Sequence, residues 1–238
     1  MDNAAYITLT RMSGLRREMQ VVANNIANAT TAGYRREGMI FSEYVVRADR
    51  DEPSLSMALG NARHSFQMQG ALSQTNGAFD FAIEGEGFFQ LETAQGPRLT
   101  RAGIFTPNEA GELVNMDGHR LLDAGGAAIF VPPDAKSIEM ARDGTLSADG
   151  LPFGQVGLVR PVDPVTMSRA AGTMFEVDGP IEPVEAPVLL QGFIEESNVD
   201  PVLELTRMIE VQRAYERGQS LLEREDERIK SVIQTLGR

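Results

Sequence analysis

Both ends of the chain carry residues at alternating steps of three and four, the spacing that aligns side chains along one stripe of an α-helix. Near the N-terminus the stripe contains Met12, Leu15, Met19, Val22 and Ile26. Near the C-terminus it is longer and includes polar residues: Leu205, Met208, Gln212, Tyr215, Gln219, Leu222, Asp226, Ile229, Ile233 and Leu236. One helix cannot bury so narrow a stripe by itself. We therefore expect the two ends to pack against each other, against other copies or against other proteins.

Local residues predict where both helices begin and end. The first is expected over about residues 3–29, because weak helix formers and then Gly33 follow it. The second is expected to begin after Asp200, whose carboxylate can accept hydrogen bonds from the free amides of the first turn, with Pro201 at the first helical position. It has no internal proline and can continue to about Leu236, a length of roughly 50 Å.

The middle of the chain has the spacing of β-strands. Phe79, Phe81 and Ile83 recur at every second position, and a glycine-containing turn then leads into Phe88 and Phe89, which we expect in a β-domain core. Further turn sequences follow at regular intervals: Gln95-Gly96-Pro97, Asp117-Gly118, Gly125-Gly126, Asp143-Gly144 and Asp149-Gly150. Many short strands separated by such turns indicate an antiparallel domain.

These patterns predict an α+β fold in which long N- and C-terminal α-helices form a coiled-coil domain and a central domain is antiparallel and all-β. Residues 1–40 and 195–238 would supply the two helices, and residues 76–194 the β domain. Residues 41–75 are predicted to be an extended linker, because charged residues and Pro53 interrupt their scattered apolar residues.

Composition excludes several classes of function. The net charge of -12 disfavours binding to nucleic acid or to anionic lipid, because contacts to phosphates normally come from Lys and Arg. No apolar run reaches the roughly 20 residues of a membrane-spanning helix, and the first residues do not resemble a cleaved secretory signal. The absence of cysteine rules out disulfides and thiolate metal sites. His64 and His119 are isolated, so we expect neither metal nor cofactor.

An enzyme is the competing class of function, for example a hydrolase that acts on cell-wall glycan. Glycosidases need two carboxylates at a set separation, and Asp80, Glu84 and Glu86 are candidates. Asp80 and Glu84 lie on the polar side of an alternating strand, where solvated carboxylates are ordinary. We therefore expect no catalysis.

Three polar residues recur at one position of the C-terminal stripe: Gln212, Gln219 and Asp226. If buried between helices, their hydrogen bonds would fix how one helix slides along another. Alternatively, they lie at the solvated edge of a wider apolar face that contains Val202, Ile209 and Val211. The sequence leaves both readings open.

Three strings, in order along the chain, resemble the flagellar basal-body rod and hook proteins of bacteria. The first string, residues 23–36, reads ANNIANATTAGYRR and is similar to the family's NNLANxxTxGF/Y(K/R) signature. The second begins at Phe79 and continues through Gly87-Phe88-Phe89 and the stretch 99–105 to Asp117-Gly118. The third contains ESNVD at 196–200 and MIEVQRAYE at 208–216.

The resemblance implies a structural subunit that assembles helically, with the terminal helices in an inner coiled-coil tube and the β domains outside. Such a subunit would form the drive shaft that crosses the periplasm, and it would be exported unfolded by the flagellar type III apparatus. The chain is too short for the extra outer domain of hook proteins, so a rod subunit is implied. Met1-Asp2 with Tyr6 and the stretch 143–147 look most like a proximal rod member, with a distal rod member as the alternative. The expected partners are other rod subunits, proximal and distal, and the export apparatus.

The expected site is therefore an assembly interface along both helices. Asn24, Asn25 and Asn28 are predicted to bond to neighbouring subunits, with ordinary helix-end polarity as the alternative. Tyr34 with Arg35 and Arg36 either anchors the exit chain, the segment that leaves the first helix, on acidic neighbours, or the two arginines are a solvated basic pair. Besides the two apolar stripes, the interface residues that we expect are Ile209, Gln212, Arg213, Tyr215 and Gln219.

Overall fold

The computed structural model describes residues 2–46 and 55–236 and divides the chain into two compact units. We call Met1–Ala27, Glu37–Phe66 and Asp200–Arg238 the helical unit, and Asn28–Arg36 and Gln67–Val199 the β unit. A long helix lies at each end of the chain, and antiparallel strands lie between them. The predicted α+β class is confirmed.

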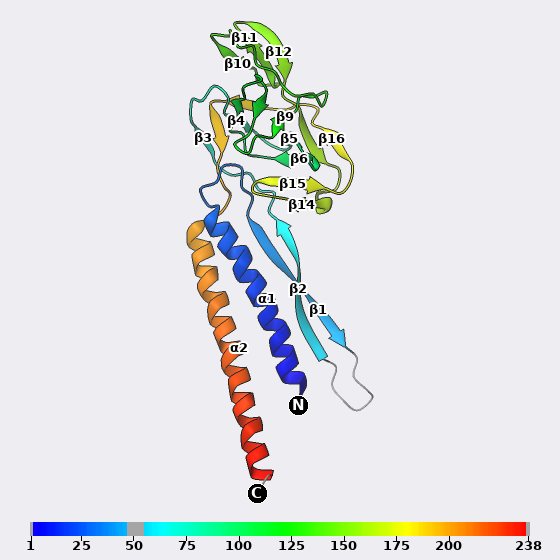
Figure 1. The fold of residues 1–238 in the computed structure, drawn as a ribbon, viewed down its shortest axis with the longest axis vertical. Helices are drawn as coiled ribbons and strands as arrows, with labels where there is room; N and C mark the ends of the chain where they lie inside the picture. The colour runs from blue at the N-terminus through cyan, green and yellow to red at the C-terminus, as the bar shows by residue number, and fades with distance from the viewer. Residues whose placement is uncertain (1, 47–54, 237–238) are drawn as a thin grey trace. The chain divides into compact units, whose positions relative to one another are not determined.

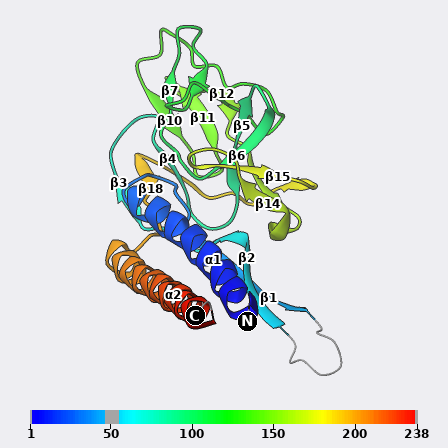
Figure 2. The same ribbon diagram turned by 60° about the horizontal axis from the view of Figure 1, so that its bottom comes forward.

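The helical unit consists of two helices and one hairpin. Helix α1 spans Asp2–Ala27 and helix α2 spans Pro201–Leu236, while strands β1 (Glu37–Val46) and β2 (Leu55–Ser65) pair with each other. Figures 1 and 2 show α1 between α2 on one side and the β1–β2 hairpin on the other. Because α1 has a neighbour on both sides, buried residues follow more than one stripe of its surface.

The beginning of α2 is as predicted. The Asp200 carboxylate accepts hydrogen bonds from the amides of Val202 and Leu203, at 2.9 and 3.1 Å, and Pro201 is the first helical residue. Helix α2 then continues without a break for 36 residues. In the part of the chain that the structure describes, no helix is both long and apolar enough to cross a bilayer.

The segment that we predicted as an extended linker, residues 41–75, has a different structure. It contains most of β1, all of β2 and the short strand β3 (Leu72–Gln74). Strands β1 and β2 pair from Glu37 opposite Ser65 to Val46 opposite Leu55, with one irregularity after Ile40. Leu55, Met57 and Leu59 alternate with small residues, a spacing typical of a strand. We did not predict this strand because the charged residues just before it indicated a linker. Those charged residues and Pro53 fall mainly in 47–54, outside the described residues.

The β unit is built from short antiparallel strands. Its largest sheet has the order β14-β15-β6-β5-β9-β8-β7, with β13 joining β5 to β16, and smaller pairings are β10-β11-β12, β4-β17 and β3-β18. The bounds are β4 Phe81–Ile83, β5 Phe88–Thr93, β6 Gly96–Thr100, β7 Thr106–Pro107, β8 Leu113–Val114, β9 Arg120–Leu121, β10 Ile138–Met140, β11 Thr145–Ala148, β12 Leu151–Gln155, β13 Leu158–Pro161, β14 Met167–Arg169, β15 Met174–Val177, β16 Ile181–Pro183, β17 Leu189–Gln191 and β18 Phe193–Glu195.

Two clusters of side chains fill the β unit. The larger contains Phe81, Phe89 and Leu121, each with no exposed surface, and Phe105 packs edge-on against Phe89. The smaller contains Phe88, Leu99 and Phe175. The prediction that Phe88 and Phe89 belong to the β core is therefore confirmed, with the two neighbours facing opposite sides of strand β5 as the pleat requires.

Candidate functional site

Within the helical unit, α1 and α2 are antiparallel and in contact over most of the length of α1. The Asn25 side chain donates to the Glu204 carboxylate at 3.1 Å, and Glu18 accepts two hydrogen bonds from Arg207 at 2.7 and 3.0 Å. Further along, Gly218 lies against Met12. The N-terminal stripe is covered accordingly: Met12, Leu15 and Val22 are buried, and Met19 and Ile26 are half-buried.

Within the single chain, one stripe of α2 is buried or half-buried. It has the predicted steps of three and four, but several of its members lie one residue before those of the predicted stripe. Its buried or half-buried members are Glu204, Met208, Val211, Tyr215, Gly218, Leu222 and Glu225. Three of the predicted members are shared: Met208, Tyr215 and Leu222. The others are exposed in the single chain: Leu205, Gln212, Gln219, Asp226, Ile229 and Ile233, together with Ile209 and Arg213, while the side chain of Leu236 lies outside the described residues.

Gln212, Gln219 and Asp226 are exposed in the single chain, as the second reading has it, but Val202 and Ile209 of the apolar face in that reading are exposed as well. Val211 is 5% exposed and lies on the covered stripe, whereas the three polar residues lie beside it at the solvent edge. Gln212 donates to Glu216 on its own helix at 3.2 Å. Their role in fixing register between copies remains a prediction.

Helix α2 is longer than the helix that covers it. Met12 packs on Gly218, and α1 begins at Asp2 whereas α2 continues to Leu236. For antiparallel helices with a rise of about 1.5 Å per residue, α2 then extends roughly 12 Å past the start of α1. Figure 1 shows this overhang at the C-terminal end of α2. Ile229, Val232 and Ile233 lie there and are 46, 52 and 64% exposed.

Asn25 has a contact that differs from the prediction. Its side chain is 1% exposed, donates to the backbone carbonyl of Glu37 at 2.8 Å and accepts from the Glu37 amide at 2.9 Å, in addition to its bond to Glu204. In the single chain this amide therefore joins α1, β1 and α2. Asn24 is exposed, and the half-buried Asn28 accepts a hydrogen bond from Thr31. The predicted bonds to neighbouring subunits remain predictions.

A second polar group, in the β unit, joins one residue from each of the first two motif strings and the residue just before the third. Glu195 lies between Arg35 and Arg101, with Oε1 3.0 Å from Nη2 of Arg35 and Oε2 3.0 Å from Nε of Arg101. All three side chains are at most 3% exposed. The Arg101 contact is an ion pair by distance but is not aligned as a hydrogen bond. Burial lowers the pKa of both guanidinium groups, that of Arg101 to about 10, although Glu195 acts in the opposite direction.

Backbone contacts around this group hold three segments together. The Gly33 amide donates to the Glu195 carbonyl at 2.7 Å, and the Asn198 amide donates to the Tyr34 carbonyl at 3.3 Å. The Met68 carbonyl accepts from both the Arg35 and the Asn198 side chains. The chain passes between the two units after residues 27, 36, 66 and 199, and these contacts tie together, inside the β unit, the segments next to the last three of these passages.

Arg35 is therefore not solvated: it holds the exit chain on Glu195, an acidic residue of the same unit. Tyr34 is also fixed, with the Arg169 guanidinium 4.3 Å from the centroid of its ring. Sequence reasoning missed Glu195 and Arg101 as members of this group. Arg101 stands in the second string and Glu195 next to the third, but nothing in their spacing shows that they meet Arg35.

The carboxylates considered for catalysis make ordinary structural contacts. Asp80 accepts a hydrogen bond from Thr75 at 2.6 Å, and Glu86 pairs with Arg160 at 3.2 Å, both at the surface. Glu84 is exposed. Among the described residues, no group of three or more His, Asp or Glu could hold a metal ion.

Known proteins match the chain in the same three regions. Residues 6–35 match a family described as flagella basal body rod protein, residues 82–148 the D1 domain of flagellar hook protein FlgE/F/G, and residues 190–235 the C-terminal region of flagellar basal body rod FlgEFG proteins. A flagellar basal-body rod protein FlgF of Caulobacter vibrioides is 36% identical, with 100% of this chain and 99% of the relative aligned. The chain belongs to the flagellar basal-body rod protein family.

Other relatives in this rod protein family agree. A FlgF of Mesorhizobium japonicum is also 36% identical over 100% of this chain and 99% of its own length. A flagellar basal-body rod protein FlgG of Agrobacterium fabrum is 30% identical over 98% of this chain and 99% of its own length. The family assignment therefore covers both units, and the predicted resemblance is confirmed.

Proposed function

We propose that this chain is a structural subunit of the proximal flagellar rod and that it assembles helically through its terminal helices, which pack with those of neighbouring subunits in a coiled-coil arrangement. The observation that carries the proposal is the overhang of α2. Glu225, Ile229 and Val232 continue the stripe that α1 covers over residues 204–225, at the same steps of three and four. Ile229 and Val232 are left exposed where α1 has ended.

The energy of covering this stripe favours assembly. Burying a Val, Leu or Ile side chain contributes roughly 1.5–3 kcal/mol relative to leaving it in water. The overhang offers Ile229, Val232 and Ile233, which are 46 to 64% exposed. The beginning of α2 offers Val202, Leu205 and Ile209, which are 51 to 69% exposed. A helix from another subunit could bury both patches, and Gln212 and Gln219 between them would then set the register.

The family supplies the setting of this proposal. Relatives over the full chain are named as FlgF rod proteins, and relatives named FlgG align over 98% of the chain. We therefore place the subunit in the rod that crosses the periplasm, with proximal and distal rod proteins as neighbours. It would reach that position through the flagellar type III export apparatus. The role is structural and requires no substrate turnover.

Substitutions in the overhang test the proposal. In the bacterium that encodes the chain, we expect deletion of the gene to abolish swimming and to leave basal bodies without a complete rod. The intact gene should restore both, whereas Ile229→Asp combined with Ile233→Asp should not. The matched control is Lys230→Asp combined with Gln234→Asp, at exposed positions of the same turns.

The purified overhang variant should keep the far-ultraviolet circular dichroism and thermal unfolding of the unmodified chain, because in the register set by Met12 and Gly218 these residues lie past the start of α1. Loss of rod assembly without loss of folding supports packing between subunits. Normal swimming with both overhang substitutions in place would contradict the proposal.

A further inference from the structure

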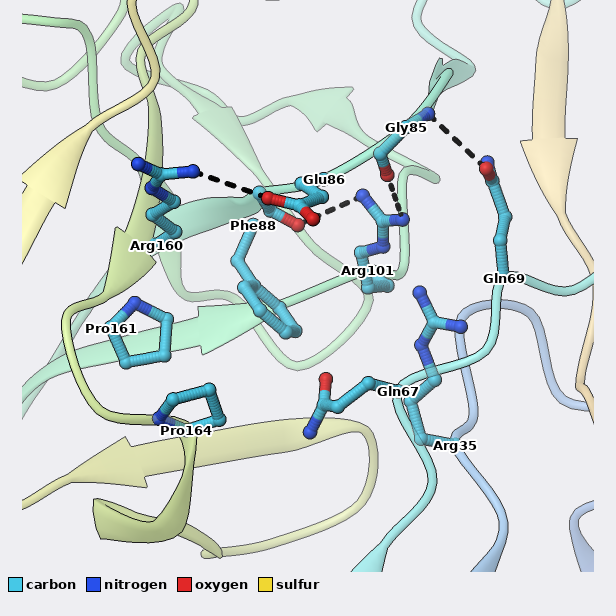
Figure 3. A pocket seen from close by; sticks show the side chains of 11 residues that line it. Arg35, Gln67, Gln69, Gly85, Glu86, Phe88, Arg101, Arg160, Pro161 and Pro164 are labelled. Carbon is cyan, nitrogen blue, oxygen red and sulfur yellow. Dashed lines mark hydrogen bonds and ion pairs between the residues drawn. The ribbon is translucent and has the colours of Figure 1, made fainter.

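The β unit contains a cavity next to the buried ionic group. Its volume is about 390 Å³, and its walls include Arg35, Arg101, Phe88, Pro161, Pro164 and Gln67. Figure 3 shows the two arginines on one side of this space and the Phe88 ring with both prolines on the other. Gln69, the turn at 85–87 and Arg160 complete the wall, with the Gly85 amide donating to the Gln69 side chain at 3.2 Å.

The buried charges around this cavity do not balance. Arg35 and Arg101 both line it and are at most 3% exposed, whereas their common partner Glu195 does not line it. Two buried cations are thus paired with one buried anion. Arg160, Glu86 and Glu182 form ion pairs at the mouth, but each of these side chains is at least 43% exposed, so water screens their charges.

Arg35 keeps a hydrogen-bond donor that the described part of the protein does not use. Among the described residues, the buried Nε atoms of Arg35 and Arg101 have no aligned hydrogen-bond partner. Nε of Arg101 nevertheless lies 3.0 Å from Oε2 of Glu195, so the unused donor is Nε of Arg35. The remaining groups of Arg101 are fixed, because Nη1 donates to the Gly87 carbonyl at 2.8 Å and Nη2 donates to the Gly85 carbonyl. A buried guanidinium with a free N–H is costly unless an acceptor reaches it. An anion with planar oxygen acceptors matches guanidinium geometry well.

We propose that this cavity is a binding site for a carboxylate group. The carboxylate binds beside Arg35 and Arg101 and supplies the second negative charge, while the apolar carbons that carry it lie against Phe88, Pro161 and Pro164. Two sources offer this chemistry: a diffusible organic acid, and an acidic side chain on a second copy of the chain. The chain has 34 Asp and Glu residues against 22 Lys and Arg, so acidic side chains are abundant on any copy.

Titration of the full chain with succinate tests the site directly. Arginine Nε–H signals in NMR spectra report the two guanidinium groups, and succinamide, which is similar in size but uncharged, is the matched control at constant ionic strength. We expect saturable shifts of the Arg35 and Arg101 signals with succinate and none with succinamide. An absence of saturation, or an equal response to succinamide, would overturn the proposal.

A substitution that supplies the carboxylate from inside the chain provides a second test that leaves the arginines intact. Gln67 lines the cavity, so Gln67→Glu places a carboxylate in it without a change of size. The control is Gln95→Glu, at an exposed turn of the same unit. The chain already has a net charge of -12, so one more negative charge at the surface should leave its thermal stability unchanged or lower it. Gln67→Glu should instead raise the melting temperature by about 2–4 °C relative to the control and abolish the succinate response. An unchanged succinate response in Gln67→Glu would overturn the proposal.

Sedimentation velocity separates the two sources of the carboxylate. If a second copy supplies it, the chain associates at high concentration and succinate, but not succinamide, reverses that association. If a diffusible acid is the ligand, succinate binds without a change in sedimentation. Both results support a carboxylate site, and neither depends on assembly of the rod through α1 and α2.

Discussion

The Nη2 atom of Arg35 lies 3.0 Å from Oε1 of Glu195, and this contact joins the segment that follows α1 to the segment that precedes α2. Both side chains are at most 2% exposed. Because Glu195 also pairs with Arg101 and accepts a hydrogen bond from the Gly70 amide, one carboxylate holds four parts of the β unit. This carboxylate thereby fixes, inside the β unit, the segments next to three of the points where the chain passes to the helical unit.

Removal of the charge of Glu195 should destabilise the β unit strongly. Glu195→Gln leaves Arg35 and Arg101 buried without a counter-charge, and a broken buried pair costs about 3–5 kcal/mol. Urea unfolding followed by circular dichroism should show this loss. Glu92→Gln is the control, because Glu92 pairs with Arg120 at 2.9 Å while about half exposed, and such pairs contribute about 0.2–1 kcal/mol. Similar midpoints for the two variants would contradict a central role for Glu195.

Gly33 is required by both its conformation and its surroundings. Its φ is +70°, and a Cβ atom there would lie 2.1 Å from the Ala102 backbone nitrogen. Gly118 has a φ of +82° with nothing within 4 Å of such an atom. Gly118→Ala should therefore cost only the backbone strain, about 1–2 kcal/mol. Gly33→Ala should cost clearly more, because the exit chain must move away from Ala102; equal unfolding midpoints would show that the close approach is unimportant.

The sequence predicts those parts of the fold that depend on local patterns. The seven-residue spacing gave both helices, the Asp200-Pro201 pair gave the start of α2, and the turn sequences gave an antiparallel β domain. The hairpin β1–β2 was missed, because its strand alternation is weak beside the charged stretch that separates the two strands. Spacing alone cannot show which face of α2 packs on α1: Glu204 is buried there, whereas Leu205 of the predicted stripe is exposed in the single chain. The role of the predicted stripe between subunits stays a prediction.

The buried group around Glu195 could not be predicted for a different reason. Its members are far apart in the sequence, and each resembles an ordinary surface charge when read locally. Only the fold brings them together, and burial then changes their energetics, since an isolated arginine in water needs no partner while a buried one does. Such long-range polar contacts are the part of this molecule that a single sequence leaves open.

The turn at Asp149 should give a pH-dependent contribution to stability. Its carboxylate accepts from the Lys136 and Ser137 amides, at 3.2 and 3.0 Å, and these bonds, the first most strongly, lower the pKa of Asp149 from its ordinary value of 3.8. A lowered carboxyl pKa means that the native state holds the proton less tightly than the unfolded state. The stabilisation is therefore complete above about pH 4 and lost as the pH falls through the native pKa.

Asp149→Asn isolates this charge, because asparagine also tolerates the φ of +49° at this position and keeps an acceptor oxygen. We expect the variant to melt below the unmodified chain at neutral pH, with a difference that shrinks as the pH is lowered past 3.8. Thermal unfolding at successive pH values measures it. A difference that stays constant across that range would exclude the charge as its origin.

Gly218 determines how closely the two helices pack. A Cβ atom on Gly218 would lie 2.9 Å from Cγ of Met12, so a larger side chain must push α1 and α2 apart. Gly218→Leu improves helix propensity by roughly 0.5–1 kcal/mol, but overpacking at a tight contact costs about 1–3 kcal/mol. The control is Gln219→Leu at the next residue, because Gln219 is exposed and a leucine there alters only the solvent-facing side of α2. We expect Gly218→Leu to lower the melting temperature of the helical unit and Gln219→Leu to leave it nearly unchanged. If both variants melt alike, the antiparallel contact of α1 with α2 is not formed in the free subunit, and the exposed stripe on α2 must then be longer than the overhang alone.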